Sequence, residues 1–196
     1  TLKLGATPWP PFTDAPGKAR FAIDLVHAAL ERIGMGEETT IVAEGTLTAA
    51  LLEGRFQGSP ALWRDAEREN VLLYSKPYLE NRLVLVGRRG SDVSAPTLGA
   101  LARKRVALIR GYAYGDAIEN AGPVWIKSRS EEDSLSVLLK GAVDYTLMDE
   151  LVVQYIVNNY PKESETKLQI GSTPLLKREL YFAVRRSRPD AESSIA

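Results

Sequence analysis

The side chains that could carry out chemistry in this chain are few and of limited kinds. The 196 residues include no cysteine and a single histidine, His27. This composition excludes disulfides, thiolate chemistry, zinc fingers and nearly all histidine-centred metal sites, so we expect neither a metal nor a cofactor. His27 falls on a predicted helix and has no plausible nucleophile partner in the sequence. Serine-, cysteine- or metal-based catalytic machinery is not recognisable.

Carboxylates are the remaining candidates for acid–base work. Glu44 and Asp149 could serve as a general acid and a general base, which leaves an enzyme as one alternative. Asp149 could equally be the N-cap of the helix that follows it. Gly111 and Gly115 lie in a turn, but the Gly-Lys-Ser/Thr ending of a phosphate-binding loop is missing. We therefore expect a protein that is not an enzyme.

The bulk composition is that of an ordinary globular protein. Lys and Arg balance Asp and Glu at 25 each, so nothing attracts the chain to a nucleic-acid backbone. No stretch approaches the roughly 18 apolar residues that cross a bilayer. Thr1 leads straight into a strand-like segment, so an exported protein would have to begin here after its cleavage point. The absence of cysteine fits either compartment.

The N-terminal part of the chain alternates short strands with helices. Residues 2–6 read as a strand, and residues 21–33 have apolar positions at helical spacing. Gly34 ends that helix. A short strand is predicted over residues 40–43, and a second helix over residues 47–54.

A similar unit recurs later in the chain. Ser130, with Asp133 three residues on, makes a start that resembles a capping box. Residues 138–143 then repeat the helix, glycine stop and strand entry of residues 51–56. Recurrence of this unit in two halves that both alternate strand and helix predicts two α/β lobes.

Two strand-like runs could connect these lobes. One covers residues 82–87 and the other residues 180–184, so the last strand could return to the first lobe. We predict lobe 1 from residues 1–83 and 181–196, and lobe 2 from residues 84–180 inserted between them. The two crossings would form a hinge with a cleft between the lobes.

An ordered set of short motifs runs over nearly the whole chain and resembles the family 3 extracellular solute-binding proteins, the amino-acid-binding components of bacterial uptake transporters. The motifs are Trp9-Pro10-Pro11-Phe12, Asp24-Leu25, Leu51 to Gly54 with Phe56, Glu67-Arg68, Tyr74 to Tyr78, Arg105-Val106-Ala107 to Gly111, Val143-Asp144, Asp149, and Tyr181 to Val184. This resemblance implies a type II periplasmic-binding-protein fold, with two α/β lobes joined by a two-strand hinge.

The resemblance also implies roles for charged residues. Arg68 lies ten residues before the tyrosine of the Pro77-Tyr78 pair, where the family places the arginine that grips the ligand carboxylate. The alternative is that Arg68 belongs to a charged surface run, residues 64–69, and pairs with its neighbours. Asp149 matches the aspartate that receives the ligand ammonium. We predict that both residues approach one cleft from opposite lobes.

Further ligand contacts follow from the same resemblance. Trp9 matches an aromatic that lies against the ligand, whereas Phe12 could equally belong to the core. Tyr112 and Ala113 fall in a strand-to-helix turn whose amides point at the ligand in the family.

Two positions depart from the family pattern. Glu44 replaces an aromatic residue, and Trp63 stands among residues that replace small glycine and threonine residues. Both substitutions put the amino-acid specificity in doubt and favour a cationic amino acid or another amine. The alternative is that Glu44 points to solvent and Trp63 packs on the lobe surface.

The expected function is that of a periplasmic or extracellular solute-binding protein. It would close on a small polar solute, an amino acid or related amine, and deliver it to the membrane permease of an ABC transporter. A monomer is expected. One alternative is the ligand-sensing input domain of a signalling receptor, and another is a dehydratase-like enzyme on the same fold.

Overall fold

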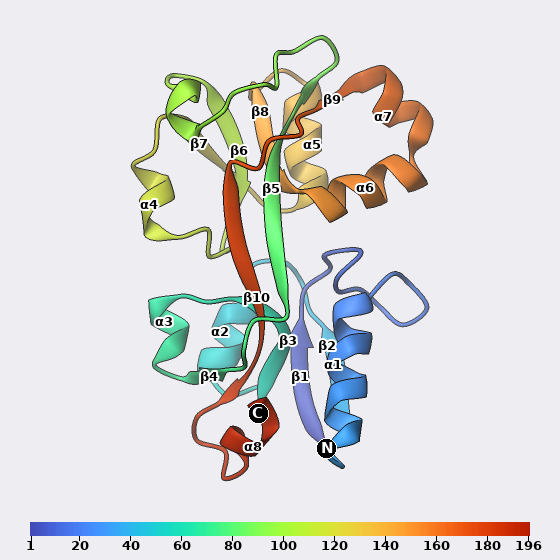
Figure 1. The fold of residues 1–196 in the computed structure, drawn as a ribbon, viewed down its shortest axis with the longest axis vertical. Coiled ribbons are helices and arrows are strands. Elements are labelled where there is room, and N and C mark those ends of the chain that lie inside the picture. The colour runs from blue at the N-terminus through green and yellow to red at the C-terminus, as the bar shows by residue number, and fades with distance from the viewer. The chain divides into compact units, whose positions relative to one another are not determined.

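The computed structural model describes residues 1–196, with the side chain of Glu119 excepted. Within it the chain divides into two compact units (Figure 1). Unit 1 comprises Thr1–Glu80 and Glu179–Ala196, and unit 2 comprises Asn81–Arg178. The chain passes from one unit to the other within two ten-residue strands, β5 (Leu79–Arg88) and β10 (Leu176–Arg185). The boundaries predicted from the sequence fall within the same two strands.

Unit 1 contains four further strands and four helices. The strands are β1 (Leu2–Ala6), β2 (Glu37–Ile41), β3 (Gly58–Trp63) and β4 (Leu72–Tyr74). The helices are α1 (Phe21–Arg32), α2 (Leu47–Leu52), α3 (Ala66–Glu69) and α8 (Ala191–Ile195).

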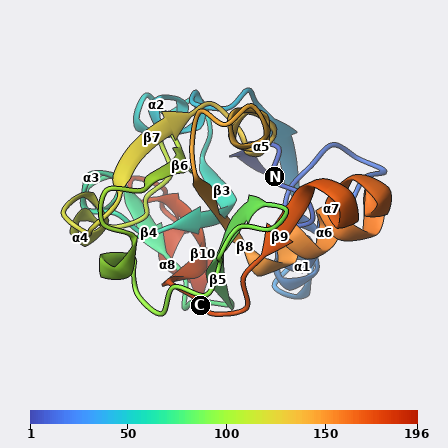
Figure 2. The ribbon, with the colours of Figure 1, turned by 90° about the horizontal axis from the view of Figure 1, so that it is seen from above.

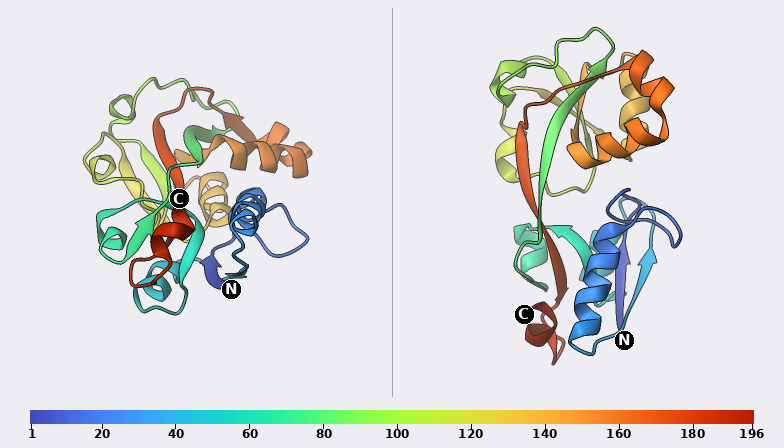
Figure 3. Two further views of the ribbon diagram at one scale, coloured as in Figure 1. Left: turned by 60° about the horizontal axis from the view of Figure 1, so that its bottom comes forward. Right: turned by 45° about the vertical axis from the view of Figure 1, so that its right-hand side comes forward.

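The sheet of unit 1 has the order β2-β1-β3-β10, and β4 pairs with β10 as well. Strand β1 runs parallel to both β2 and β3, whereas β3 and β4 run antiparallel to β10. Helix α1 packs against β2 and β3, beside the sheet as the right-hand view of Figure 3 shows. Parallel strands joined through a helix are the βαβ unit that the strand–helix alternation predicts.

The alternation of side chains along β10 divides the core of unit 1 between the two faces of its sheet. Phe182 and Val184 join a cluster with the inner face of α1. Tyr181 and Ala183 join a second cluster with α2 and with Leu62 of β3. Each face of the sheet is therefore covered by helix, and the guanidinium of Arg64 lies over Tyr74 and Tyr181 of the second cluster.

Unit 2 repeats the pattern with different lengths. Its strands besides β5 are β6 (Arg105–Ile109), β7 (Val124–Ser128), β8 (Tyr145–Asp149) and β9 (Leu168–Ile170). Its helices are the 3-10 turn η1 (Leu98–Leu101), α4 (Asp116–Glu119), α5 (Glu131–Leu139), α6 (Glu150–Asn159) and α7 (Pro161–Lys167).

The sheet of unit 2 has the order β5-β8-β6-β7, with β9 added to β5. Strand β8 is parallel to β6 and antiparallel to β5. Helix α5 packs on β6 and β8, and α6 and α7 lie side by side (Figure 2). The run Leu83–Val86 is buried on both faces of the sheet, which explains its unbroken apolar sequence.

Several sequence predictions are confirmed in detail. The strand at residues 2–6 is β1, and the helix predicted over residues 21–33 is α1. At α5 the Ser130 hydroxyl accepts a hydrogen bond from Asp133 N, as in a capping box, whereas Asp133 Oδ2 accepts its hydrogen bond from Arg129 N, one residue before the N-cap. The strand predicted over residues 40–43 lies earlier, over Glu37–Ile41. None of the described helices is both long enough and apolar enough to cross a membrane.

Candidate ligand-binding site

An aromatic cluster follows β1 in unit 1. Trp9 and Thr13 exchange two backbone hydrogen bonds of 2.7 and 3.0 Å, which fold the intervening prolines into a tight turn. The turn brings the Trp9 and Phe12 rings to 4.3 Å between centroids, tilted by 38°, and places Trp9 edge-to-face with Trp63 at 5.7 Å. Phe12 is fully buried and also contacts Phe21, so it has the core role that the sequence left open. Within this cluster, Trp9 and Trp63 are the two tryptophans, and they contact each other edge to face.

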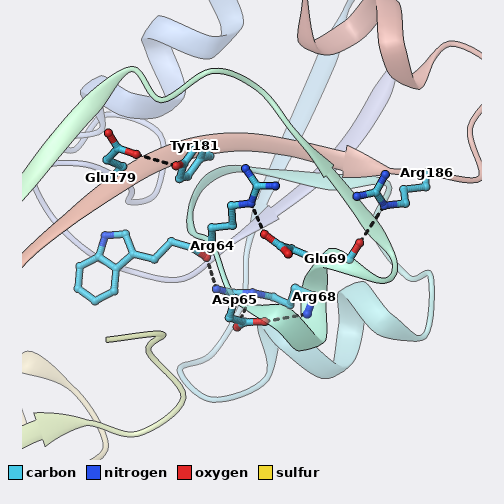
Figure 4. Close-up of polar contacts among 8 residues, drawn as sticks. Arg64, Asp65, Arg68, Glu69, Glu179, Tyr181 and Arg186 are labelled. Carbon is cyan, nitrogen blue, oxygen red and sulfur yellow. Dashed lines mark hydrogen bonds and ion pairs between the residues drawn. The ribbon is translucent and has the colours of Figure 1, made fainter. Parts of the chain in front are cut away.

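Arg68 is buried, with 4% of its surface exposed, although it lies in a charged segment. Its Nη2 donates a hydrogen bond to the backbone carbonyl of Trp63, and its Nε lies 3.1 Å from Asp65 Oδ2 (Figure 4). Tyr74 contacts the same guanidinium: burial raises the pKa of its phenol, and the hydrogen bond and charge of Arg68 lower it. The positive charge of Arg68 is therefore compensated inside unit 1.

Asp65 is the residue that makes this arrangement possible. It is the N-cap of α3, and its Oδ1 accepts a hydrogen bond of 2.7 Å from Arg68 N. One carboxylate oxygen therefore caps the helix backbone, and the other pairs with the side chain one turn later. Asp65 and Arg68 hold each other in a fixed geometry.

Arg64 adds a second cation to this segment. Its guanidinium lies 5.4 Å from the centroid of the Tyr74 ring and 5.9 Å from that of Tyr181. Its Nε pairs with Glu69 Oε1, and the Tyr181 hydroxyl donates a 2.8 Å hydrogen bond to Glu179 (Figure 4). Arg64 thus lies over two tyrosine faces, which is a favourable position for a cation.

Glu44 lies on the loop between β2 and α2 and is half-buried. Burial raises the pKa of its carboxyl from 4.5 to about 7. No hydrogen bond or neighbouring charge lowers the pKa of Glu44 in turn. The group is therefore poised between its two protonation states near neutral pH, and a cation placed beside it would favour the ionised form.

Asp149 ends β8 in unit 2 and is 3% exposed. Its Oδ1 accepts hydrogen bonds from Leu151 N at 2.8 Å and Val152 N at 3.2 Å, so it is the N-cap of α6. Its Oδ2 accepts a 2.9 Å hydrogen bond from Nδ2 of the fully buried Asn81. Burial raises the pKa of Asp149, and these hydrogen bonds lower it in part. None of these contributions to the pKa of Asp149 comes from a cationic group.

The strand-to-helix turn after β6 holds Tyr112 and Ala113, both half-buried. Gly111 and Gly115 flank the pair at φ values of 84° and 106°, which only glycine adopts readily. The Tyr114 hydroxyl accepts a hydrogen bond of 2.9 Å from Ile109 N, which ties the turn back to its strand.

The predicted site residues are thus distributed over the two units. Unit 1 brings Trp9, Phe12, Trp63 and Arg68 into one connected set, and Glu44 lies on a separate loop of the same unit. Unit 2 holds Tyr112 and Ala113 in one turn and Asp149 at the end of another strand. Their contact with a ligand stays a prediction.

Three residues were not predicted to matter. For Asp65 the sequence offers one local indication: a residue type that often caps helices lies three positions before an arginine. Asn81 and the placement of Arg64 over tyrosine rings gave no local signal. In the part of the chain with described side chains, no three His, Asp or Glu residues gather where they could hold a metal ion.

Comparison with known proteins places the fold. The structure matches the arginine-bound form of truncated ArgBP from T. maritima (TM-score 0.79, 24% identity, 99% of this chain and 92% of that one). It also matches the GluR0 ligand-binding core from Nostoc punctiforme in complex with L-glutamate (TM-score 0.79, 19% identity, 99% and 89%). A third match is the BvgS VFT2 domain of Bordetella pertussis (TM-score 0.83, 23% identity, 99% and 84%).

At the sequence level, the chain is similar to the virulence sensor protein BvgS. It is 27% identical to that of Bordetella bronchiseptica over 148 residues, which are 74% of this chain. It is 26% identical to that of Bordetella pertussis over 150 residues, or 75% of the chain. The matched segment is 12% of the length of each of these relatives. No protein-family model matches the chain.

The chain therefore has the type II periplasmic-binding-protein fold, and the fold prediction is confirmed. Its structural neighbours are binding proteins and sensor domains. Among them, the virulence sensor BvgS is similar in both sequence and structure.

Proposed function

We propose that this chain is a ligand-binding domain that works outside the cytoplasm, is not an enzyme, and closes on a small polar solute. The observation that carries this proposal is the fold match over 99% of the chain to an arginine-bound and a glutamate-bound protein. Trp9, Trp63 and Glu44 of unit 1, and Asp149 with the Tyr112–Ala113 turn of unit 2, are the proposed solute contacts. The chemistry of the side chains suits a solute with an amine: two aromatic faces and two carboxylates.

A thermal-shift screen against amino acids, polyamines and small organic acids tests this function. A solute at a hundred times its dissociation constant stabilises the folded protein by about 2.7 kcal/mol. For a chain of this size we expect the melting temperature to rise by roughly 5–10 °C. Calorimetric titration with each hit then gives its affinity. If no solute in the screen raises the melting temperature, the proposed function is wrong.

Two settings suit such a domain: the binding component of an ABC transporter, and the input domain of a receptor. The similarity to BvgS sensors specifically favours the receptor. Deleting the gene separates the two. A transporter component predicts loss of uptake of the identified solute by the cells. A receptor predicts unchanged uptake and loss of the transcriptional response to the same solute.

A further inference from the structure

The family resemblance implies that Arg68 holds a ligand carboxylate, yet its guanidinium already has a carboxylate partner. Asp65 Oδ2 lies 3.1 Å from Arg68 Nε, and the side chain of Arg68 is 5% exposed. On the same edge of the guanidinium, Nη2 donates to the Trp63 carbonyl. A carboxylate from solution that approached this edge for a bidentate contact would compete with Asp65 and the Trp63 carbonyl for these donors.

The partnership is also preorganised. Asp65 Oδ1 is fixed by its 2.7 Å hydrogen bond from Arg68 N, so its side chain loses little additional freedom when Oδ2 pairs with the guanidinium. Asp65 is joined to Arg68 by three peptide bonds, which gives it an effective concentration on the order of millimolar or above. A free solute at micromolar concentration does not displace such a partner.

This pairing changes the charge of the candidate site. Asp65 and Arg68 cancel each other within unit 1, and Arg64 pairs with Glu69. The carboxyl groups that remain among the proposed contacts are Glu44 and Asp149, whose pKa shifts have no cationic cause. The proposed contacts therefore offer groups that attract a cation and no uncompensated cation for an anion.

We propose that Asp65 is a built-in carboxylate partner of Arg68, and that the site therefore selects small amines or guanidines that carry no carboxylate. This inference rests on the proposed function and names its solute class. Asp65 is the specificity-determining residue, because it occupies the one buried arginine that would otherwise recognise an amino acid.

Matched solutes that differ by one carboxylate test the selectivity. We expect the parent protein to bind agmatine more tightly than arginine, and cadaverine more tightly than lysine. Asp65→Thr keeps a helix-capping side chain but removes the partner of Arg68. This variant should shift the preference toward arginine by about ten- to a hundredfold, the worth of a charge-assisted hydrogen bond. A parent protein that binds arginine as tightly as agmatine, or more tightly, overturns the proposal.

A second experiment needs no identified solute. Sodium acetate, compared with sodium chloride at equal ionic strength, should raise the melting temperature of Asp65→Thr and leave that of the parent protein unchanged. The matched control is the double variant Asp65→Thr/Arg68→Gln, which should not respond because it lacks the guanidinium.

Each outcome of the acetate experiment decides the role of Asp65. Stabilisation of the parent protein by acetate, or no stabilisation of Asp65→Thr, contradicts the proposal. Asp65→Asn, which is isosteric and also caps helices, replaces Asp65→Thr if the latter does not fold. If the solute screen fails but acetate stabilises Asp65→Thr alone, the proposed function is wrong, whereas the pairing of Asp65 with Arg68 holds.

Discussion

Exchanging the two partners of the Asn81–Asp149 hydrogen bond separates the structural role of Asp149 from its proposed role in ligand binding. In Asp149→Asn the remaining oxygen can still cap α6, but an NH2 group replaces the oxygen that lies 2.9 Å from Asn81 Nδ2. Two donors then face each other in a buried setting. Losing a hydrogen bond to a charged acceptor costs about 1.5–3 kcal/mol, and removing a buried charge offsets part of this cost.

We expect Asp149→Asn to lower the free energy of unfolding by about 1–3 kcal/mol. Asn81→Asp should cost more, because it places two carboxylates in contact. The double variant Asn81→Asp/Asp149→Asn restores a donor facing an acceptor, so it should be more stable than either single variant. Urea unfolding followed by circular dichroism measures all four proteins as a double-mutant cycle. A double variant no more stable than Asp149→Asn refutes this reasoning, since the Asn81 amide would then have turned to relieve the contact.

Solute affinity adds an independent result. If the Asp149 carboxylate contacts the amine of the solute, both Asp149→Asn and the double variant bind about ten- to a hundredfold more weakly. Stability would then be recovered in the double variant while affinity would not. If affinity instead follows stability through the cycle, Asp149 acts on the solute through the fold alone.

Three more predictions concern unit 1. The stability of the parent should fall as pH rises from 4.5 to 7, because the unfolded chain ionises Glu44 before the folded protein does. The total loss over this range is below about 3 kcal/mol, since solvent screens the half-buried carboxyl, and Glu44→Gln should flatten the pH dependence in denaturant titrations. Gly58→Ala should unfold the domain or lower its melting temperature severely, because the new Cβ would lie 2.1 Å from the carbonyl oxygen of Ala183. The control is Gly99→Ala, where there is room for the methyl group. Arg64→Ala should lower the free energy of unfolding by about 1–2 kcal/mol, because it removes a cation from two tyrosine faces and from Glu69. An unchanged midpoint of urea unfolding would contradict this prediction.

The elements that the sequence predicts well are those with one strong local signal. Helix α1 has apolar residues at helical spacing and a glycine stop, so its extent is predicted to within one residue at its end. Strand β2 has polar residues, Glu37 to Thr40, because it lies at the edge of its sheet and pairs with β1. An edge strand has less apolar surface to bury, so a search for apolar runs places it too late in the chain.

The site was harder to predict because its contacts join distant residues. Tyr74 and Tyr181 flank Arg64 because the antiparallel pairing of β4 with β10 brings Tyr74 opposite Ala183. Asn81 meets Asp149 because β5 pairs with β8, which brings residues 68 positions apart together. Neither register can be read from local periodicity. The burial of Arg68 likewise follows from packing and not from its charged neighbours in the sequence.

Asp65 and Asp149 show why a cap and a ligand contact need not be alternatives. Each lies at or just after the end of a strand, Asp149 as the last residue of β8 and Asp65 two residues after β3, and each uses Oδ1 to cap the next helix. The second oxygen is what differs: in Asp65 it faces the guanidinium of Arg68, whereas in Asp149 it faces the neutral amide of Asn81. A neutral partner leaves the negative charge of Asp149 uncompensated. We therefore predict that a cationic solute is attracted to Asp149 and gains little from Asp65, although both aspartates lie where a strand gives way to a helix.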